Sequence, residues 1–133
     1  MPVVTVELLE GTVTPEQKQK IATDVTQVLV DSSVLVERIV VIIKENPKGN
    51  WAVGSVFQTE ENKPPVFVSF EEIEELFLEK QKKRFVNVVS KTFADLGFPP
   101  ERTVIILRDN SWKDWAVGGV LQVEFADHIP PLT

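Results

Sequence analysis

Apolar and polar residues alternate along two stretches of the chain. The alternation runs from Val3 to Leu9 and again from Val66 to Phe70, and a period of two is typical of a strand with one buried face. Two β-branched runs, residues 39–43 and 103–107, indicate two further strands. The hydrophobic pattern therefore predicts four strands.

Between the strands of each pair, apolar residues recur at the spacing of an amphipathic helix. The first stripe consists of Ile21, Val25, Val28 and Leu29, and the second of Phe85, Val89, Phe93 and Leu96. Thr14 precedes the first stripe, with Pro15 at the first helical position and Gln17 placed to complete a capping box. Gly97, followed by Pro99, ends the second stripe. Two helices are expected, one in each half of the chain.

The two halves of the chain have related sequences at a constant offset of 64 residues. VERIVVIIKENPKGNWAVGS, residues 36–55, and PERTVIILRDNSWKDWAVGG, residues 100–119, are identical at nine of twenty positions. An internal duplication is the simplest explanation. We expect a single domain, residues 1–133, made of two repeats, residues 1–61 and 65–133, with residues 62–65 joining them.

Each repeat has the order strand, helix, strand, which predicts a right-handed crossover and a parallel pair of strands. The expected fold is α/β (α+β): two tandem βαβ units forming a four-stranded sheet with two helices on one face. Two helices cover one face only, and the other face would also carry apolar residues. We therefore expect that oligomerisation buries the second face.

Composition excludes several classes of function. The net charge is −6, acidic residues gather between Glu71 and Glu79, and no basic stripe offsets them, so a nucleic-acid partner is not expected. We expect this acidic segment to lie outside the core. No apolar run could span a bilayer and no signal-type segment is present, so a cytoplasmic protein without a membrane partner is predicted. With no cysteine and one histidine, neither a metal nor a cofactor is expected.

Pro2 follows Met1 at the start of the first strand. If Met1 is removed, Pro2 carries a free secondary amine, which can act as a base. The alternative is that proline is tolerated there because no neighbouring strand needs its N–H. Val66 occupies the equivalent position in the second repeat, and the nitrogen of Pro65 beside it is acylated. The chain is therefore expected to have one amine site.

These features together resemble the tautomerase superfamily, in particular the 4-oxalocrotonate tautomerase group in a fused, two-unit form. The resemblance covers essentially the whole chain and rests on the Pro2 start, LLEG before the first helix, the TPEQK helix entry, the VVII strand and the KGNWAVG turn. It implies a tautomerase/MIF-like fold, Pro2 as the catalytic base or acid, and a homotrimer. The second unit also looks like the malonate semialdehyde decarboxylase and chloroacrylate dehalogenase groups.

The sequence departs from this resemblance where arginines that hold carboxylates are expected. Thr12, Val40 and Val104 stand at those positions, and the acidic segment replaces an arginine pair ahead of the second helix. The resemblance thus implies a tautomerase-like isomerase, or a related lyase or hydratase, acting on a small α-keto or enol acid that is not a dicarboxylate. The alternative is a non-catalytic trimeric scaffold or small-molecule binder of the same fold.

Three arginines are candidates to bind a substrate carboxylate. Arg38 and Arg102 lie two residues before the positions of the missing arginines, on the same strand face if the strand begins that early. They could instead pair with the neighbouring Glu37 and Glu101 at the surface. Arg108, at the end of a strand, is either a third substrate contact or a solvated charge.

The resemblance also implies roles for two further residues. Trp115 aligns with an aromatic residue that walls the proline pocket from the partner unit, although it could equally pack around a tight turn. Asp109 matches an acid that orients water in some hydrating members, and a turn-forming aspartate is the alternative. From its position near the end of the chain, His128 is expected to be a tail residue, and the alternative is that it reaches the site of a neighbouring subunit.

Overall fold

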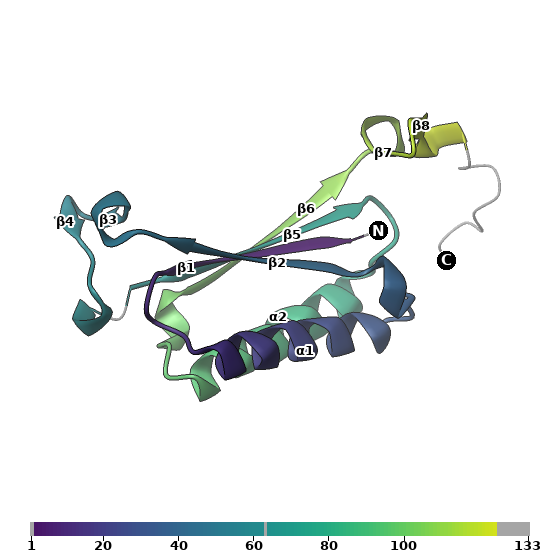
Figure 1. The fold of residues 1–133 in the computed structure, drawn as a ribbon. Helices are drawn as coiled ribbons and strands as arrows, with labels where there is room; N and C mark the ends of the chain where they lie inside the picture. Colours follow the sequence, from purple (N-terminus) through teal and green to yellow (C-terminus); the bar gives the residue numbers. More distant parts are fainter. Residues whose placement is uncertain (1, 63, 125–133) are drawn as a thin grey trace.

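The computed structural model describes residues 2–62 and 64–124. The four main strands are β1 (Val3–Leu9), β2 (Val40–Asn46), β5 (Val66–Ile73) and β6 (Thr103–Asn110). They form one sheet in the order β2-β1-β5-β6, in which β1 and β5 are antiparallel and each of the outer pairs is parallel. The helices α1 (Pro15–Val30) and α2 (Glu79–Asp95) both lie against one face of this sheet, as Figure 1 shows. The predicted fold is confirmed.

The first helix begins with the capping box that its sequence predicts, and the second has an equivalent hydrogen bond that was not predicted. The Thr14 hydroxyl accepts from the Gln17 backbone N–H at 3.1 Å, and the Gln17 side chain accepts from the Thr14 N–H at 2.8 Å. In α2 the Gln81 side chain accepts from the Leu78 N–H at 2.8 Å. Gly97 follows α2 with a φ of +93°, which stops the helix at little steric cost.

The core lies between the sheet and the helices. On the strands it contains Val4, Val6, Leu8, Val66, Val68 and Phe70, and on the helices Ile21, Val25, Val28, Leu29, Phe85, Val89 and Phe93. Both predicted helical stripes are therefore buried, except that Leu96 is half-buried because it follows the last helical residue. Alternate strand residues point to the other face of the sheet, where Ile42 and Ile106 are exposed.

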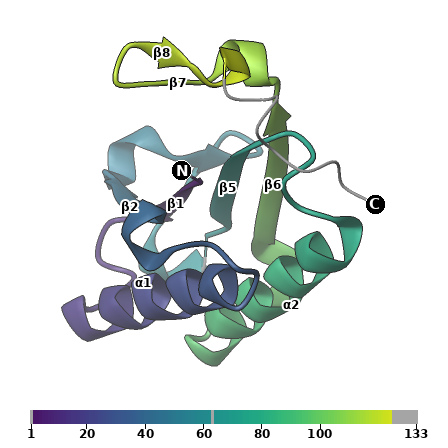
Figure 2. The same ribbon diagram turned by 90° about the vertical axis from the view of Figure 1, so that its right-hand side faces the viewer.

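Two small hairpins extend the molecule beyond opposite ends of the sheet (Figure 1). They consist of β3 (Ala52–Val53) with β4 (Val56–Phe57), and β7 (Ala116–Val117) with β8 (Val120–Leu121). Figure 2 shows the second hairpin on the side of the sheet away from the helices. The sequence predicted only turns here. Positive φ angles at Gly54 and Ser55 produce a two-residue hairpin turn, which keeps each strand too short for a periodic signal.

Short 3₁₀ turns connect the main elements. They are η1 (Val36–Arg38), η2 (Lys48–Asn50), η3 (Glu60–Asn62), η4 (Pro100–Arg102) and η5 (Trp112–Asp114). Within the part of the chain that the structure describes, no helix is both long and apolar enough to cross a membrane. His128 lies outside the described residues.

The antiparallel pairing of β1 with β5 relates the two repeats by an approximate twofold axis. Val3 pairs with Glu71, and Glu71 pairs with Arg108, so the start of β1 lies beside the ends of β5 and β6. Conversely, the start of β5 lies beside the end of β1, where Phe67 pairs with Glu7. Each end of the sheet therefore combines residues of both repeats.

The expectation that the whole acidic segment lies outside the core is wrong for two residues, Ile73, which is 5% exposed, and Glu72. Glu75 and Glu79 are exposed and Glu71 is half-buried, but Glu72 is 2% exposed. The reason is that β5 continues to Ile73, beyond the predicted end at Phe70. The alternation that buries Phe70 consequently turns Glu72 toward the helices as well.

Candidate active site at the start of the first strand

Pro2 is buried at the start of β1, and its backbone is held by the neighbouring strand. The Pro2 carbonyl accepts a hydrogen bond of 3.2 Å from the Val40 N–H, which continues the ladder between β1 and β2 by one residue. The proline ring is therefore fixed against the sheet. Pro2 also lines an adjoining pocket, through which a small molecule could reach it.

A pocket of about 500 Å³ opens beside Pro2. Its walls come from the segment between α1 and β2 and from the segment that leads into α2. The lining residues are Pro2, Ser32, Ser33, Val34, Leu35, Arg38, Leu76, Phe77 and Gln81. A volume of this size suits a small organic molecule. Among the described residues that line it, Arg38 is the charged one.

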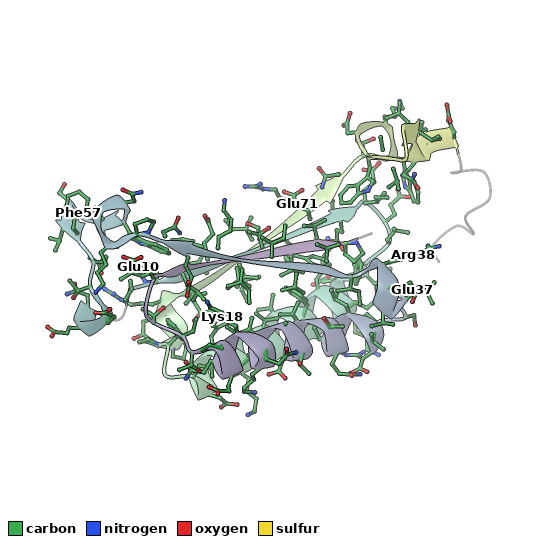
Figure 3. The ribbon with its side chains drawn as sticks, viewed as in Figure 1. Glu10, Lys18, Glu37, Arg38, Phe57 and Glu71 are labelled. Carbon is green, nitrogen blue, oxygen red and sulfur yellow. The ribbon has the colours of Figure 1, made fainter. Side chains whose placement is uncertain are left out.

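Arg38 is the predicted arginine that the structure brings to Pro2. It ends η1, is exposed, and its guanidinium makes no hydrogen bond or ion pair with any of the described residues. Figure 3 shows Arg38 beside Glu37 at the end of the molecule. Because its charge is unmatched there, Arg38 can bind the carboxylate of a ligand in the pocket.

Arg102 lies at the opposite end of the sheet, next to the start of β5. Its guanidinium donates to the Asn62 carbonyl at 2.9 Å. One pocket at that end has about 170 Å³, and it is lined by Gly11, Thr12, Glu60, Pro64, Leu96, Gly97 and Phe98. Lys48 forms an ion pair of 2.7 Å with Glu60 there. Within one chain, then, Arg102 and Pro2 belong to different ends.

Arg108 lies on the sheet face turned away from the helices, near the start of β1. It pairs with Glu71 at 3.0 Å, and the Asn110 amide donates to the other oxygen of Glu71 at 2.7 Å. Glu71 is labelled on that face in Figure 3. The first repeat has an ion pair of the same kind, Lys44 with Glu7 at 3.8 Å. Arg108 is therefore neither free nor simply solvated.

Trp115 is half-buried and immediately precedes β7, where its carbonyl accepts from the Gln122 N–H at 2.8 Å. Figures 1 and 2 show its hairpin at the same end of the sheet as the start of β1, over the outer face. The equivalent Trp51 packs against Phe67 with ring centroids 5.8 Å apart. Within its own chain Trp115 is absent from the lining of the Pro2 pocket.

Asp109 belongs to a polar cluster under the sheet that sequence analysis did not predict. The Lys82 ammonium, in the first turn of α2, lies 2.8 Å from Asp109 and 3.7 Å from Glu72. Neither carboxyl oxygen of Glu72 has a hydrogen-bond donor among the described residues. At the offset of 64 residues, Lys82 and Asp109 correspond to Lys18 and Glu45, which form an ion pair of 3.1 Å. The lysine and the acid repeated at these positions were the sequence signal for this part of the cluster.

Burial raises the pKa of the Glu72 carboxyl to about 8, with a smaller contribution from the neighbouring Asp109. The pKa of Asp109 is lowered, first by its hydrogen bond with Glu72 and then by Lys82. The hydrogen bond to Asp109 also raises the pKa of Lys82. At neutral pH the buried Glu72 carboxyl is therefore mostly uncharged as long as no further cation lies beside it.

The three positions where arginines were expected carry no cation. Thr12 donates its hydroxyl to the Leu9 carbonyl at 2.7 Å and lines the small pocket at the far end. Val40 is half-buried and Val104 is 39% exposed. No cluster of three or more metal-ligating side chains occurs in residues 2–62 and 64–124.

Comparison with known proteins places this geometry in a family. Residues 2–60 match the family model described as tautomerase enzyme. The match covers the first repeat, to which the second is related by the offset of 64 residues. The first repeat is thus a tautomerase-family unit. Among curated proteins, none matches the sequence.

Solved structures of fused 4-OT and related proteins have the same fold. A fused 4-OT protein, F6, described as an asymmetric trimer, has a TM-score of 0.81 and 21% identity over 93% of this chain and 98% of its own. Pt0534 inactivated by 2-oxo-3-pentynoate has a TM-score of 0.81 and 22% identity over 93% and 98%. A member of the cis-3-chloroacrylic acid dehalogenase family has a TM-score of 0.73 and 17% identity over 96% and 92%.

Proposed function

We propose that this protein is a tautomerase-superfamily enzyme in which Pro2, freed by removal of Met1, transfers a proton in the keto–enol tautomerisation of a small α-keto or enol acid. Related lyase or hydratase chemistry would use the same base. The observation that carries the proposal is the position of Pro2, which is buried and fixed at one wall of a pocket. Among the described residues that line that pocket, the charged side chain is that of Arg38.

The chemistry follows from this environment. An α-amino group has an ordinary pKa near about 7.7 to 8.0, and apolar surroundings disfavour its cation. A neutral amine at physiological pH can remove the proton next to a carbonyl and return it elsewhere. Arg38 would hold the substrate carboxylate and orient the carbon that is deprotonated. The apolar walls at Val34, Leu35 and Phe77 would contact the rest of the substrate.

One cation in the pocket suits a monocarboxylate better than a dicarboxylate. Leu35 and Leu76 are 54% and 39% exposed at the pocket, so a substrate with an apolar body would gain contact there. An enol such as phenylenolpyruvate has this combination of one charge and an aromatic ring. We therefore propose it as a better substrate than any dicarboxylate enol.

We also propose that the protein is a homotrimer whose subunits pack their outer sheet faces together. The outer face exposes Ile42, Val104 and Ile106, and the first hairpin exposes Val56 and Phe57 at 59% and 61%. Exposed apolar surface of this extent favours association. In such an assembly Trp115 and Arg102 of one subunit could reach the pocket of another, and each of the two would then be a substrate contact.

A non-catalytic binder of the same fold is the second candidate, and the absence of cations at Thr12, Val40 and Val104 favours it. The ketonisation rate of phenylenolpyruvate separates the two. Protein without Met1 should be active, whereas Pro2→Ala should lose at least about tenfold and a Met1-retaining form nearly all activity. Equal rates for the processed and Met1-retaining forms would support the binder.

Covalent labelling gives an independent test of the same amine. The neighbour Pt0534 is inactivated by 2-oxo-3-pentynoate, and a nucleophilic amine in this protein should react with the same compound. We expect one label per chain, on the peptide that begins with Pro2. Labelling elsewhere, or none in processed protein, would contradict the proposed role of Pro2.

A further inference from the structure

Glu72 lies opposite Pro2 in the register of the sheet. The ladder pairs Val4 with Phe70 and Val3 with Glu71, and one further step places Pro2 opposite Glu72. Both residues are buried, as are Val4 and Phe70, so the alternation puts all four on the helix side. Residues opposite one another on the same face of an antiparallel pair have Cβ atoms roughly 4.5–5.5 Å apart.

The other end of the sheet provides an internal comparison. Continued in that direction, the same ladder pairs Leu8 with Val66, which occupy the positions of Glu72 and Pro2 in the other repeat. Both are fully buried apolar residues. A carboxyl therefore stands opposite the proline, whereas a leucine stands opposite the valine that has no amine.

A purely structural role does not explain this carboxyl. Burying a polar group without full hydrogen bonding costs stability, and Leu8 shows that the fold accommodates a leucine at the equivalent position. Lys82 does not satisfy Glu72, because its ammonium is 3.7 Å away and is bonded to Asp109 at 2.8 Å. Glu72 thus lies beside Lys82 and Asp109, which neutralise each other, and no cation among the described residues forms a hydrogen bond with Glu72.

We propose that Glu72 is a positioning residue for the Pro2 amine: its carboxylate pairs with the protonated amine, holds it at the pocket wall and sets the pH at which it loses its proton. This inference rests on the free amine of the proposed function but not on the turnover of any substrate. When Pro2 takes a proton from a substrate, the ammonium forms beside Glu72 and is stabilised there. The two groups titrate as a coupled pair: the pKa of Glu72 is raised to about 8 while Pro2 carries no charge, and an ammonium beside the carboxyl lowers it.

The test is a titration of the amine itself. The protein would be expressed with ¹⁵N-proline, and its intact mass would show that Met1 is absent. The chemical shift of the Pro2 nitrogen would then be followed against pH by NMR. Removing a neighbouring negative charge destabilises the ammonium, so Glu72→Gln should lower the amine pKa by about one unit. Glu72→Leu, which copies Leu8, should do the same and guards against a misfolded glutamine variant.

A matched control comes from the equivalent cluster of the first repeat. Glu45→Gln removes the carboxylate that pairs with Lys18 at the far end of the sheet, and it should leave the Pro2 titration unchanged. If both Glu72 variants titrate like wild type, the inference is overturned. If Glu45→Gln shifts the Pro2 pKa as much as Glu72→Gln does, the effect is not local and the inference is also overturned.

Activity measurements keep this inference separate from the proposed function. The acid limb of kcat/KM against pH reports the amine of the free enzyme, so it should move down by the same unit in Glu72→Gln. An NMR shift in a protein without any ketonisation activity would support the coupling while contradicting the proposed function. Pro2-dependent activity with an unchanged acid limb and unchanged titration would support the function and refute the coupling.

Discussion

Arg108 and Glu71 form an ion pair of 3.0 Å on the sheet face opposite the helices, next to the start of β1. Asn110 bonds the second oxygen of the same carboxylate at 2.7 Å. The positive charge of Arg108 at this end of the outer face is therefore already matched before any ligand arrives. This local neutralisation has a direct consequence for the choice of substrate.

Releasing Arg108 should widen the range of substrates. Glu71→Ala leaves the guanidinium unpaired near Val3, so turnover of a dicarboxylate enol should rise several-fold relative to that of a monocarboxylate enol. The ratio of the two kcat/KM values measures this effect. Glu7→Ala, which frees Lys44 at the far end, is the control and should not change the ratio. An unchanged ratio in Glu71→Ala would show that Arg108 does not reach the ligand.

Arg38 should govern affinity for the substrate carboxylate. Arg38→Ala removes a charged hydrogen-bond donor, which is worth about 1.5–3 kcal/mol, so KM should rise by roughly ten- to a hundredfold. The proton transfer itself should be less affected, and steady-state kinetics would separate KM from kcat. Arg102→Ala should have the smaller effect. A larger effect from Arg102 would mean that a second subunit supplies the arginine.

Glu72 should make folding stability fall as the pH rises. Its carboxyl has a pKa of about 8 in the folded protein and 4.5 ordinarily, so between these values the unfolded chain binds fewer protons than the folded one. The contribution of Glu72 to the free energy of unfolding is therefore fully present below about pH 4.5 and is lost as the pH rises to about 8. The cause is the burial of the ionised form.

Thermal melts of a Met1-retaining form, in which Pro2 carries no charge, would measure this loss. Between pH 5 and pH 9 wild type should lose roughly 5 to 10 °C more than Glu72→Gln, given a burial cost of about 2 kcal/mol. Parallel melting curves for the two proteins across this range would be inconsistent with a carboxyl that stays protonated at neutral pH.

The outer sheet face should be required for assembly. Ile106→Glu places a charge on the exposed side of β6, where Ile106 is 38% exposed, and burying that charge in an interface is costly. Light scattering at micromolar concentration should then show a smaller species than the wild-type trimer. Asn87→Glu, on the exposed side of α2, should assemble normally. A wild-type protein that is monomeric would refute the proposed trimer.

The sequence predicts the helices and the sheet well because both depend on periodicity. Thr14 and Gln17 form the expected capping box, and the stripes at Val25 and Phe85 lie in the core. The hairpins were missed because two-residue strands carry no period. The burial of Glu72 was missed because five glutamates in one segment are typical of a solvated surface, although the alternation from Val66 onward indicated an inward position.

The candidate site was harder to predict for a different reason. Arg38 and Arg102 occupy equivalent positions in two repeats, so any argument from local sequence assigns them the same role. The antiparallel pairing of β1 with β5 separates them by the length of the sheet, and Pro2 lies at only one end. The distinction therefore depends on tertiary topology.

Joining the two repeats in one polypeptide allows the ends of the sheet to diverge in evolution. If the same sheet were built from two identical short chains, any mutation would appear at both ends of the sheet. A glutamate opposite the proline would then lower stability at both ends. Here Glu72 is present without a counterpart at Leu8. Gene fusion thus permits one end to acquire a costly charge for chemistry while selection keeps the other end for stability.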